Sequence, residues 1–170
     1  VELREAGLDR LTISLDTLDK GVFDAMSDSK FSVDDVLAGI EAAQSAGFTQ
    51  IKINAVVQKG VNDHTLIETA EHFRGTPHIL RFIEFMDVGT ANGWAMDQVV
   101  TGAEIVSTIA SRWPLEPSDA NYVGEVAKRY RYLDGQGEIG VITSVSQPFC
   151  GDCSRARLSA EGSVYTCLFA

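Results

Sequence analysis

Three cysteines near the C-terminal end of the chain have the residue type and spacing of a metal site. Cys150 and Cys153 form a CxxC pair, and Cys167 follows farther along. A closed structural zinc site needs four protein ligands, and a cubane iron–sulfur cluster usually has four cysteines. Three thiolates would leave one iron of such a cluster open to a substrate atom. Arg155 and Arg157 lie between the cysteines, and guanidinium groups recognise anions. The pattern therefore predicts an open metal site beside an anion-binding site.

Simpler explanations of the same cysteines stay open. They could hold zinc with a fourth ligand from elsewhere, or they could be three buried thiols. The histidines, His64, His72 and His78, lie in the earlier half of the chain and do not have the mutual spacing of a metal site. A non-catalytic zinc-binding module is therefore the alternative function.

Composition narrows the class of protein and its partners. The chain has 170 residues, of which 45% are hydrophobic and 22% charged, as is typical of a soluble globular domain. No stretch approaches the roughly 18 apolar residues of a membrane span, so we expect no membrane partner. A net charge of −10 argues against nucleic-acid binding, which needs a basic surface. An odd number of cysteines with a CxxC spacing favours a reducing compartment, the cytoplasm.

Strands and helices alternate over the first half of the chain. Residues 8–16, 51–58 and 79–86 are predicted strands, and helices are predicted over 33–47 and from 62 to about 74. Strands that alternate with helices favour right-handed crossovers and a parallel sheet. The fold class is therefore α/β, with about three βα units of a partial barrel.

The second part of the chain has a different rhythm. We expect a helix over 103–112, a β-hairpin that pairs 128–133 with 138–146, and a second hairpin that pairs 156–159 with 164–168. The second hairpin would return Cys167 to the other two cysteines. Residues 1–98 are accordingly expected to form the partial barrel. Residues 99–170 are expected to form a C-terminal α+β extension that carries the metal site.

One face of each predicted strand is polar. Alternation assigns to this face Thr12, Ser14, Asp16, Lys52, Asn54, Glu84 and Met86. A polar face inside a parallel α/β barrel lines a ligand site toward the carboxyl ends of the strands. Arg81 is assigned to the opposite side, which should pack under the helices, and the sequence offers no account of this.

The cysteine segment resembles a known family. The run from Phe149 to Leu158, with the later Glu161-Gly162 and Cys167-Leu168-Phe169, is similar to the C-terminal cluster motif of the GTP 3',8-cyclases, the molybdenum cofactor biosynthesis A family. These are radical S-adenosylmethionine enzymes. The segments 7–16, 52–57, 60–63 and 81–86 are similar to the same family in order and spacing.

The resemblance implies an activity and a set of site residues. The family converts GTP to (8S)-3',8-cyclo-7,8-dihydroguanosine 5'-triphosphate, the first step of molybdenum cofactor biosynthesis. By position, a C-terminal 4Fe-4S cluster would be held by Cys150, Cys153 and Cys167. Ser14 and Met86 would contact S-adenosylmethionine. GTP would be contacted by Lys52, Arg155, Ala156 and Arg157.

The resemblance also implies that cyclase activity needs residues that this chain does not contain. The family's first cluster motif, CxxxCxxC, is absent from these 170 residues. S-adenosylmethionine and a second 4Fe-4S cluster therefore belong to the full-length enzyme, and this chain alone is expected to be inactive. A homodimer is expected, because a second copy would cover exposed apolar edges.

Overall fold

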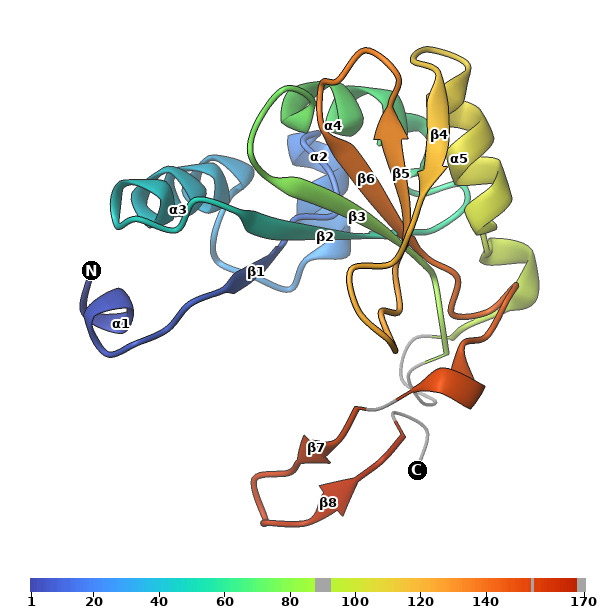
Figure 1. The fold of residues 1–170 in the computed structure, drawn as a ribbon. Helices are drawn as coiled ribbons and strands as arrows, with labels where there is room; N and C mark the ends of the chain where they lie inside the picture. Colours follow the sequence, from blue (N-terminus) through green and yellow to red (C-terminus); the bar gives the residue numbers. More distant parts are fainter. Residues whose placement is uncertain (88–92, 154, 168–170) are drawn as a thin grey trace.

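The computed structural model, which describes residues 1–87, 93–153 and 155–167, contains a six-stranded mixed sheet (Figure 1). The strands lie in the order β1-β2-β3-β6-β5-β4. Pairing is parallel from β1 through β2 and β3 to β6, and antiparallel from β6 through β5 to β4. Their bounds are β1 Leu11–Ser14, β2 Ile51–Val57, β3 Ile79–Glu84, β4 Leu115–Ser118, β5 Lys128–Tyr132 and β6 Glu138–Ile142.

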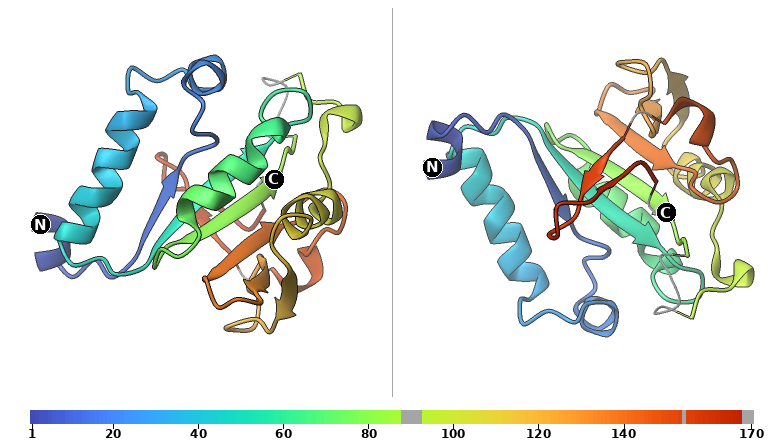
Figure 2. Two further views of the ribbon diagram at one scale, coloured as in Figure 1. Left: turned by 90° about the horizontal axis from the view of Figure 1, so that it is seen from above. Right: turned by 90° about the horizontal axis from the view of Figure 1, so that it is seen from below.

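Helices α2, α3, α4 and α5 lie over one face of this sheet, whereas the short helix α1 lies near the N-terminal end of β1 (Figures 1 and 2). The helix bounds are α1 Glu2–Glu5, α2 Lys20–Met26, α3 Val33–Ser45, α4 Leu66–Phe73 and α5 Gly102–Ala110, and the 3-10 turns are η1 Asp63–Thr65, η2 Met96–Gln98 and η3 Cys150–Asp152. Helix α3 begins with a capping box, in which the Ser32 side chain accepts from the Asp35 N–H and the Asp35 side chain accepts from the Ser32 N–H. Such caps satisfy backbone donors that have no partner inside the helix.

The expected α/β class with a parallel sheet is confirmed. The three strands of the first half and the first hairpin form where the pattern predicts them, although β4 and α2 were not anticipated. The first hairpin is part of the main sheet, because β6 pairs with β3 in parallel. Residues of the second half therefore extend the sheet of the first.

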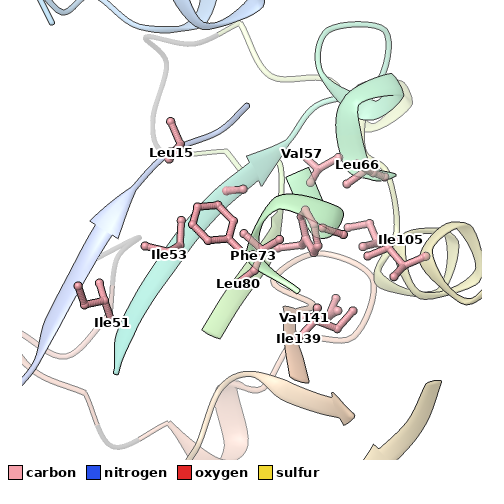
Figure 3. Close-up of a cluster of buried hydrophobic side chains, with 14 of the residues drawn as sticks. Leu15, Ile51, Ile53, Val57, Leu66, Phe73, Leu80, Ile105, Ile139 and Val141 are labelled. Carbon is pink, nitrogen blue, oxygen red and sulfur yellow. The ribbon is translucent and has the colours of Figure 1, made fainter. Parts of the chain in front are cut away.

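The core fills the space between the sheet and its helices (Figure 3). Along β2 burial alternates, so that Ile51 and Ile53 are fully buried while Lys52 is half-buried. A fully buried aliphatic side chain contributes about 1.5–3 kcal/mol. The other side chains labelled in this layer are Leu15, Val57, Leu66, Phe73, Leu80, Ile105, Ile139 and Val141.

A short second hairpin follows the sheet. Strands β7 (Arg157–Leu158) and β8 (Val164–Tyr165) pair antiparallel, as expected for the segments at 156–159 and 164–168, of which residue 168 lies outside the described ranges. The hairpin projects on the side of the sheet opposite α3 and α4 (Figures 1 and 2). This is the side to which the polar residues of β2 also point.

The helices in the described ranges are too short or too polar to span a membrane.

Candidate functional site

The polar face of the sheet is built by neighbouring residues of three strands. Asn54 on β2 is in register with Arg81 on β3, and Arg81 is in register with Gly140 on β6. Lys52 lies on the same face of β2 as Asn54, because side chains two apart in a strand point the same way. The face away from the helices thus carries Lys52, Asn54 and Arg81 side by side.

The assignment of Arg81 to the helix side is wrong. The Arg81 Nε donates to Asn54 Oδ1 at 2.9 Å, so the guanidinium lies on the polar face. Gly140 makes room for it, since a Cβ at Gly140 would lie 3.0 Å from Arg81 Cγ. Leu80 and Phe82, the neighbours of Arg81, are the β3 residues that pack in the core. Arg81 is therefore a site residue that the sequence pattern missed.

The assignment of Glu84 to the polar face is wrong for the same reason. It shares its side of β3 with Leu80 and Phe82, and its exposed fraction is 0%. Its carboxylate accepts from the N–H groups of Gly102, Val145 and Ser146. These donors compensate for the burial of the charge.

Burial and mutual repulsion affect the two cations of the polar face. Desolvation lowers the pKa of Lys52 from its ordinary value, and the nearby Arg81 charge lowers it further. Desolvation also lowers the pKa of Arg81. Glu125, in the loop after β4, acts in the opposite direction on the pKa of both groups. Two partly desolvated cations next to each other favour the binding of an anion at this face.

Ser14 and Asp16 lie at the carboxyl end of β1. Both line a pocket of about 370 Å³ between β1 and the segment of α2 and α3, together with Phe23, Met26 and Phe31. Asp16 Oδ1 accepts from the Val56 N–H at 2.8 Å, and burial raises the pKa of this carboxyl. Ser14 is exposed, and its contact with S-adenosylmethionine stays a prediction.

The assignment of Met86 to the polar face cannot rest on strand alternation. Strand β3 ends at Glu84, and Met86 follows two residues later with a partly buried side chain. Its contact with S-adenosylmethionine stays a prediction.

Cys150 and Cys153 are brought together by a single turn. They span η3, in which the Cys153 N–H donates to the Cys150 carbonyl at 3.4 Å. Arg155 Nε donates to Cys153 Sγ at 3.3 Å, and its guanidinium lies 5.0 Å from the centre of the Phe149 ring. The hydrogen bond from Arg155 lowers the pKa of the Cys153 thiol. A lowered pKa favours the thiolate, which is the form that binds metals.

Cys167 does not complete this pair in the described part of the chain. Across residues 1–87, 93–153 and 155–167, no three His, Cys, Asp or Glu side chains converge as a metal-binding group. The hairpin ladder ends at Tyr165, so strand pairing does not set the position of Cys167. The juxtaposition expected from the hairpin is thus absent among these residues, and the three-cysteine ligand set stays a prediction.

The hairpin also carries the remaining expected GTP contacts. Arg155 and Ala156 are exposed and precede β7, and Arg157 is half-buried at its start. The charges that shift the pKa of Lys52 are those of Arg81, Glu125, Arg10 and Glu138, and none of these four residues belongs to this hairpin. Ser154, Leu168 and Phe169 of the cysteine motif lie outside the described residues.

The donor chemistry fits an iron–sulfur cluster, although the three-point geometry is not assembled. The turn presents a half-buried Cys153 next to an exposed Cys150, and the cation beside Cys153 stabilises its thiolate. Soft thiolates on a CxxC turn suit an iron–sulfur cluster or zinc. The residues present could therefore supply two ligands of such a group directly.

Two protein-family models divide the chain between them. The model described as Radical SAM superfamily matches residues 2–73, and the model described as Molybdenum Cofactor Synthesis C matches residues 78–170. The match to the second family model begins one residue before β3 and includes β6, the cysteine turn and the β7–β8 hairpin.

Several curated relatives match along the whole chain. A protein named GTP 3',8-cyclase from Xanthomonas campestris pv. campestris (strain B100) is 58% identical over 170 residues, which is 100% of this chain and 50% of that protein. One from Acidothermus cellulolyticus is 57% identical over 168 residues, 99% of this chain and 46% of that protein. One from Synechococcus sp. (strain CC9902) is 47% identical over 181 residues, 100% of this chain and 52% of that protein. The chain spans about half the length of the curated relatives it matches. Because the Molybdenum Cofactor Synthesis C model covers more than half of its residues, the chain belongs to that family.

Proposed function

We propose that this chain is part of a GTP 3',8-cyclase, the radical S-adenosylmethionine enzyme that forms (8S)-3',8-cyclo-7,8-dihydroguanosine 5'-triphosphate. The observation that carries the proposal is the 58% identity over all 170 residues to a protein of that name. The family models support it independently, because one indicates radical chemistry and the other molybdenum cofactor synthesis.

The polar face of the sheet would bind the triphosphate. Lys52 and Arg81 place two cations on adjacent strands, and Asn54 orients Arg81 through its side-chain oxygen. Arg155, Ala156 and Arg157 would contact GTP from the hairpin, which projects on the same side of the sheet (Figure 1). Guanidinium groups match phosphate geometry by donating two parallel hydrogen bonds.

The two cofactor sites would flank this face. Cys150, Cys153 and Cys167 would hold the C-terminal 4Fe-4S cluster, and its open iron would meet the guanine base. Ser14, at the end of β1, and Met86, after β3, would contact S-adenosylmethionine. S-adenosylmethionine bound with the second cluster would supply the radical that takes hydrogen from the ribose. The residues of this chain would hold GTP in place and exclude water from that reaction.

The proposal extends to the organisation of the protein. Residues 1–98 would be part of the radical SAM barrel, and residues 99–170 would carry the second cluster and the GTP contacts. The enzyme would act in the cytoplasm, where thiols stay reduced. It would form a homodimer, which analytical ultracentrifugation of the full-length protein would test.

Nucleotide binding by the anaerobically reconstituted full-length protein tests the proposal. Loss of a charge-assisted phosphate contact costs about 1.5–3 kcal/mol, so Lys52→Ala should weaken GTP binding roughly tenfold to 100-fold. Arg155→Ala with Arg157→Ala removes two such contacts and should weaken GTP binding at least about 100-fold. Isothermal titration calorimetry would measure this, with iron content unchanged. Lys20→Ala is the matched control, since Lys20 is exposed and pairs with Asp34.

A second measurement separates the enzyme from the zinc module. The reconstituted protein should contain iron and sulfide and show the absorption of two 4Fe-4S clusters. Stoichiometric zinc without that absorption, together with unchanged GTP binding in the variants, would support the non-catalytic module instead.

A further inference from the structure

The buried carboxylate of Glu84 connects three segments that meet at the end of β3. Oε1 accepts from the Gly102 N–H at 2.7 Å, and Oε2 accepts from the Val145 and Ser146 N–H groups at 2.8 Å each. The Ser146 hydroxyl also donates to Oε1. All four donors are uncharged, so hydrogen bonds and not an ion pair compensate for the desolvation of this carboxylate.

The start of α5 is shaped to approach this carboxylate. A Cβ at Gly102 would lie 2.5 Å from Thr143 Cγ2, 3.0 Å from Val141 Cγ1 and 3.5 Å from Glu84 Oε1. A side chain at this position would force the helix or the Thr143 side chain to shift. The N-terminus of α5 carries a partial positive charge, which a carboxylate at this distance stabilises.

The same carboxylate holds the loop that leads into the cysteine turn. Residues 143–149 connect β6 to η3, and Val145 and Ser146 are the middle of this loop. Thr143 Oγ1 donates to the Gln147 carbonyl at 3.0 Å, which closes the loop upon itself. The position of Cys150 relative to the sheet therefore depends on where Glu84 holds the loop.

Glu84 also ends the strand from which Met86 follows. On one side a single residue, Phe85, lies between Glu84 and Met86. On the other side, residues 143–149 lead from β6 past the carboxylate to Cys150. One buried group thus sets the relative position of two segments that the proposed function assigns to different cofactors.

We propose that Glu84 is a positioning residue, which fixes the cysteine turn relative to the Met86 segment. The names of the two cofactors rest on the proposed function, whereas the mechanical connection rests on the four hydrogen bonds. Misplacement of about 1 Å costs about 100-fold in rate when two reacting groups must be aligned. A small shift of the turn should therefore affect turnover more than binding.

Glu84→Gln in the full-length protein is the first test. An amide keeps one oxygen but points an NH₂ group at backbone N–H donors, so Val145 and Ser146 should lose protection. Their amide hydrogen exchange, followed by NMR or by mass spectrometry, should become at least about tenfold faster. In the metal-free protein, alkylation of Cys150 and Cys153 should also become faster. In the reconstituted protein, kcat should fall at least about tenfold while iron content and the KM for GTP stay near wild type.

Controls separate positioning from a loss of stability. His78→Gln alters a buried hydrogen bond at the opposite end of β3, and it should change neither exchange at Val145 and Ser146 nor alkylation. Where Glu84→Gln does not fold, Ser146→Ala removes a single donor and Gly102→Ala moves the helix, and both should show the same exchange effect. Unchanged exchange in all these variants, or faster exchange with kcat unaltered, overturns the proposal.

Failure of the proposed function would be recognised separately. In that case the wild-type protein itself would lack cyclase activity. Exchange and alkylation would still decide whether Glu84 holds the turn.

Discussion

Asn62 is the buried side chain whose removal should have the largest effect at the carboxyl ends of β1 and β2. It is 2% exposed. Its Nδ2 donates to the carbonyls of Asp16 and Val56, and its Oδ1 accepts from the Gln58 N–H, each at 2.8 Å. This one amide therefore satisfies three backbone groups that the sheet itself leaves without partners.

The cost of Asn62→Ala follows from these three bonds. Each buried backbone group that loses its partner costs about 1–3 kcal/mol. Partial access of water to the cavity reduces this, so the expected loss in the free energy of unfolding is about 3–5 kcal/mol. Domain stability is typically about 5–15 kcal/mol. The variant should therefore be close to the limit of stable folding.

Equilibrium urea unfolding followed by circular dichroism would measure the loss. Asn62→Asp should be nearly as harmful, because a carboxylate cannot donate to the two carbonyls and would be repelled by them. Asn121→Ala is the control, since Asn121 is exposed and its side chain accepts from Arg129 at the surface, and it should cost less than about 1 kcal/mol. A loss below about 1 kcal/mol for Asn62→Ala would refute the reasoning.

Two further predictions concern the polar face and the start of β3. Burial lowers the pKa of His78, so the unfolded chain binds a proton at a higher pH than the folded chain does. The free energy of unfolding should therefore fall by up to about 1.4 kcal/mol per pH unit as the pH drops below about 6.5. In unfolding measurements from pH 5 to 8, His78→Gln should lose this dependence. Gly140→Ala would place a Cβ 3.0 Å from Arg81 Cγ and 3.3 Å from Ala127 Cβ, which should cost about 1–3 kcal/mol and weaken nucleotide binding in calorimetry. Gly39→Ala, in an open helical position, should instead be neutral or stabilising by up to about 1 kcal/mol, and equal effects of the two glycine changes would contradict this account.

Local features of the chain could be predicted from the sequence because they depend on nearby residues. The capping box at Ser32 and the alternation of strands with helices involve contacts within a few positions. The polar face of β2 was predictable for the same reason, since Lys52 and Asn54 lie between fully apolar neighbours. The CxxC turn also needs only four consecutive residues.

Only the tertiary structure decided the face of β3. In the run Ile79 to Phe85 both alternate sets contain apolar residues and one charged residue, so the pattern by itself is degenerate. Packing of Leu80 and Phe82 in the core resolves it, together with the donors that meet Glu84. Arg81 is thereby turned to the polar face.

Long-range pairing was likewise beyond the sequence pattern. That β6 lies beside β3 depends on contacts between residues far apart in the chain, for which a single sequence has no periodic signal. The hairpin ladder has two residue pairs and ends at Tyr165, so local strand pairing does not set the place of Cys167. Residue spacing therefore determined which groups could do chemistry, and packing determined which of them meet, because burial and hydrogen bonding act on the whole chain at once.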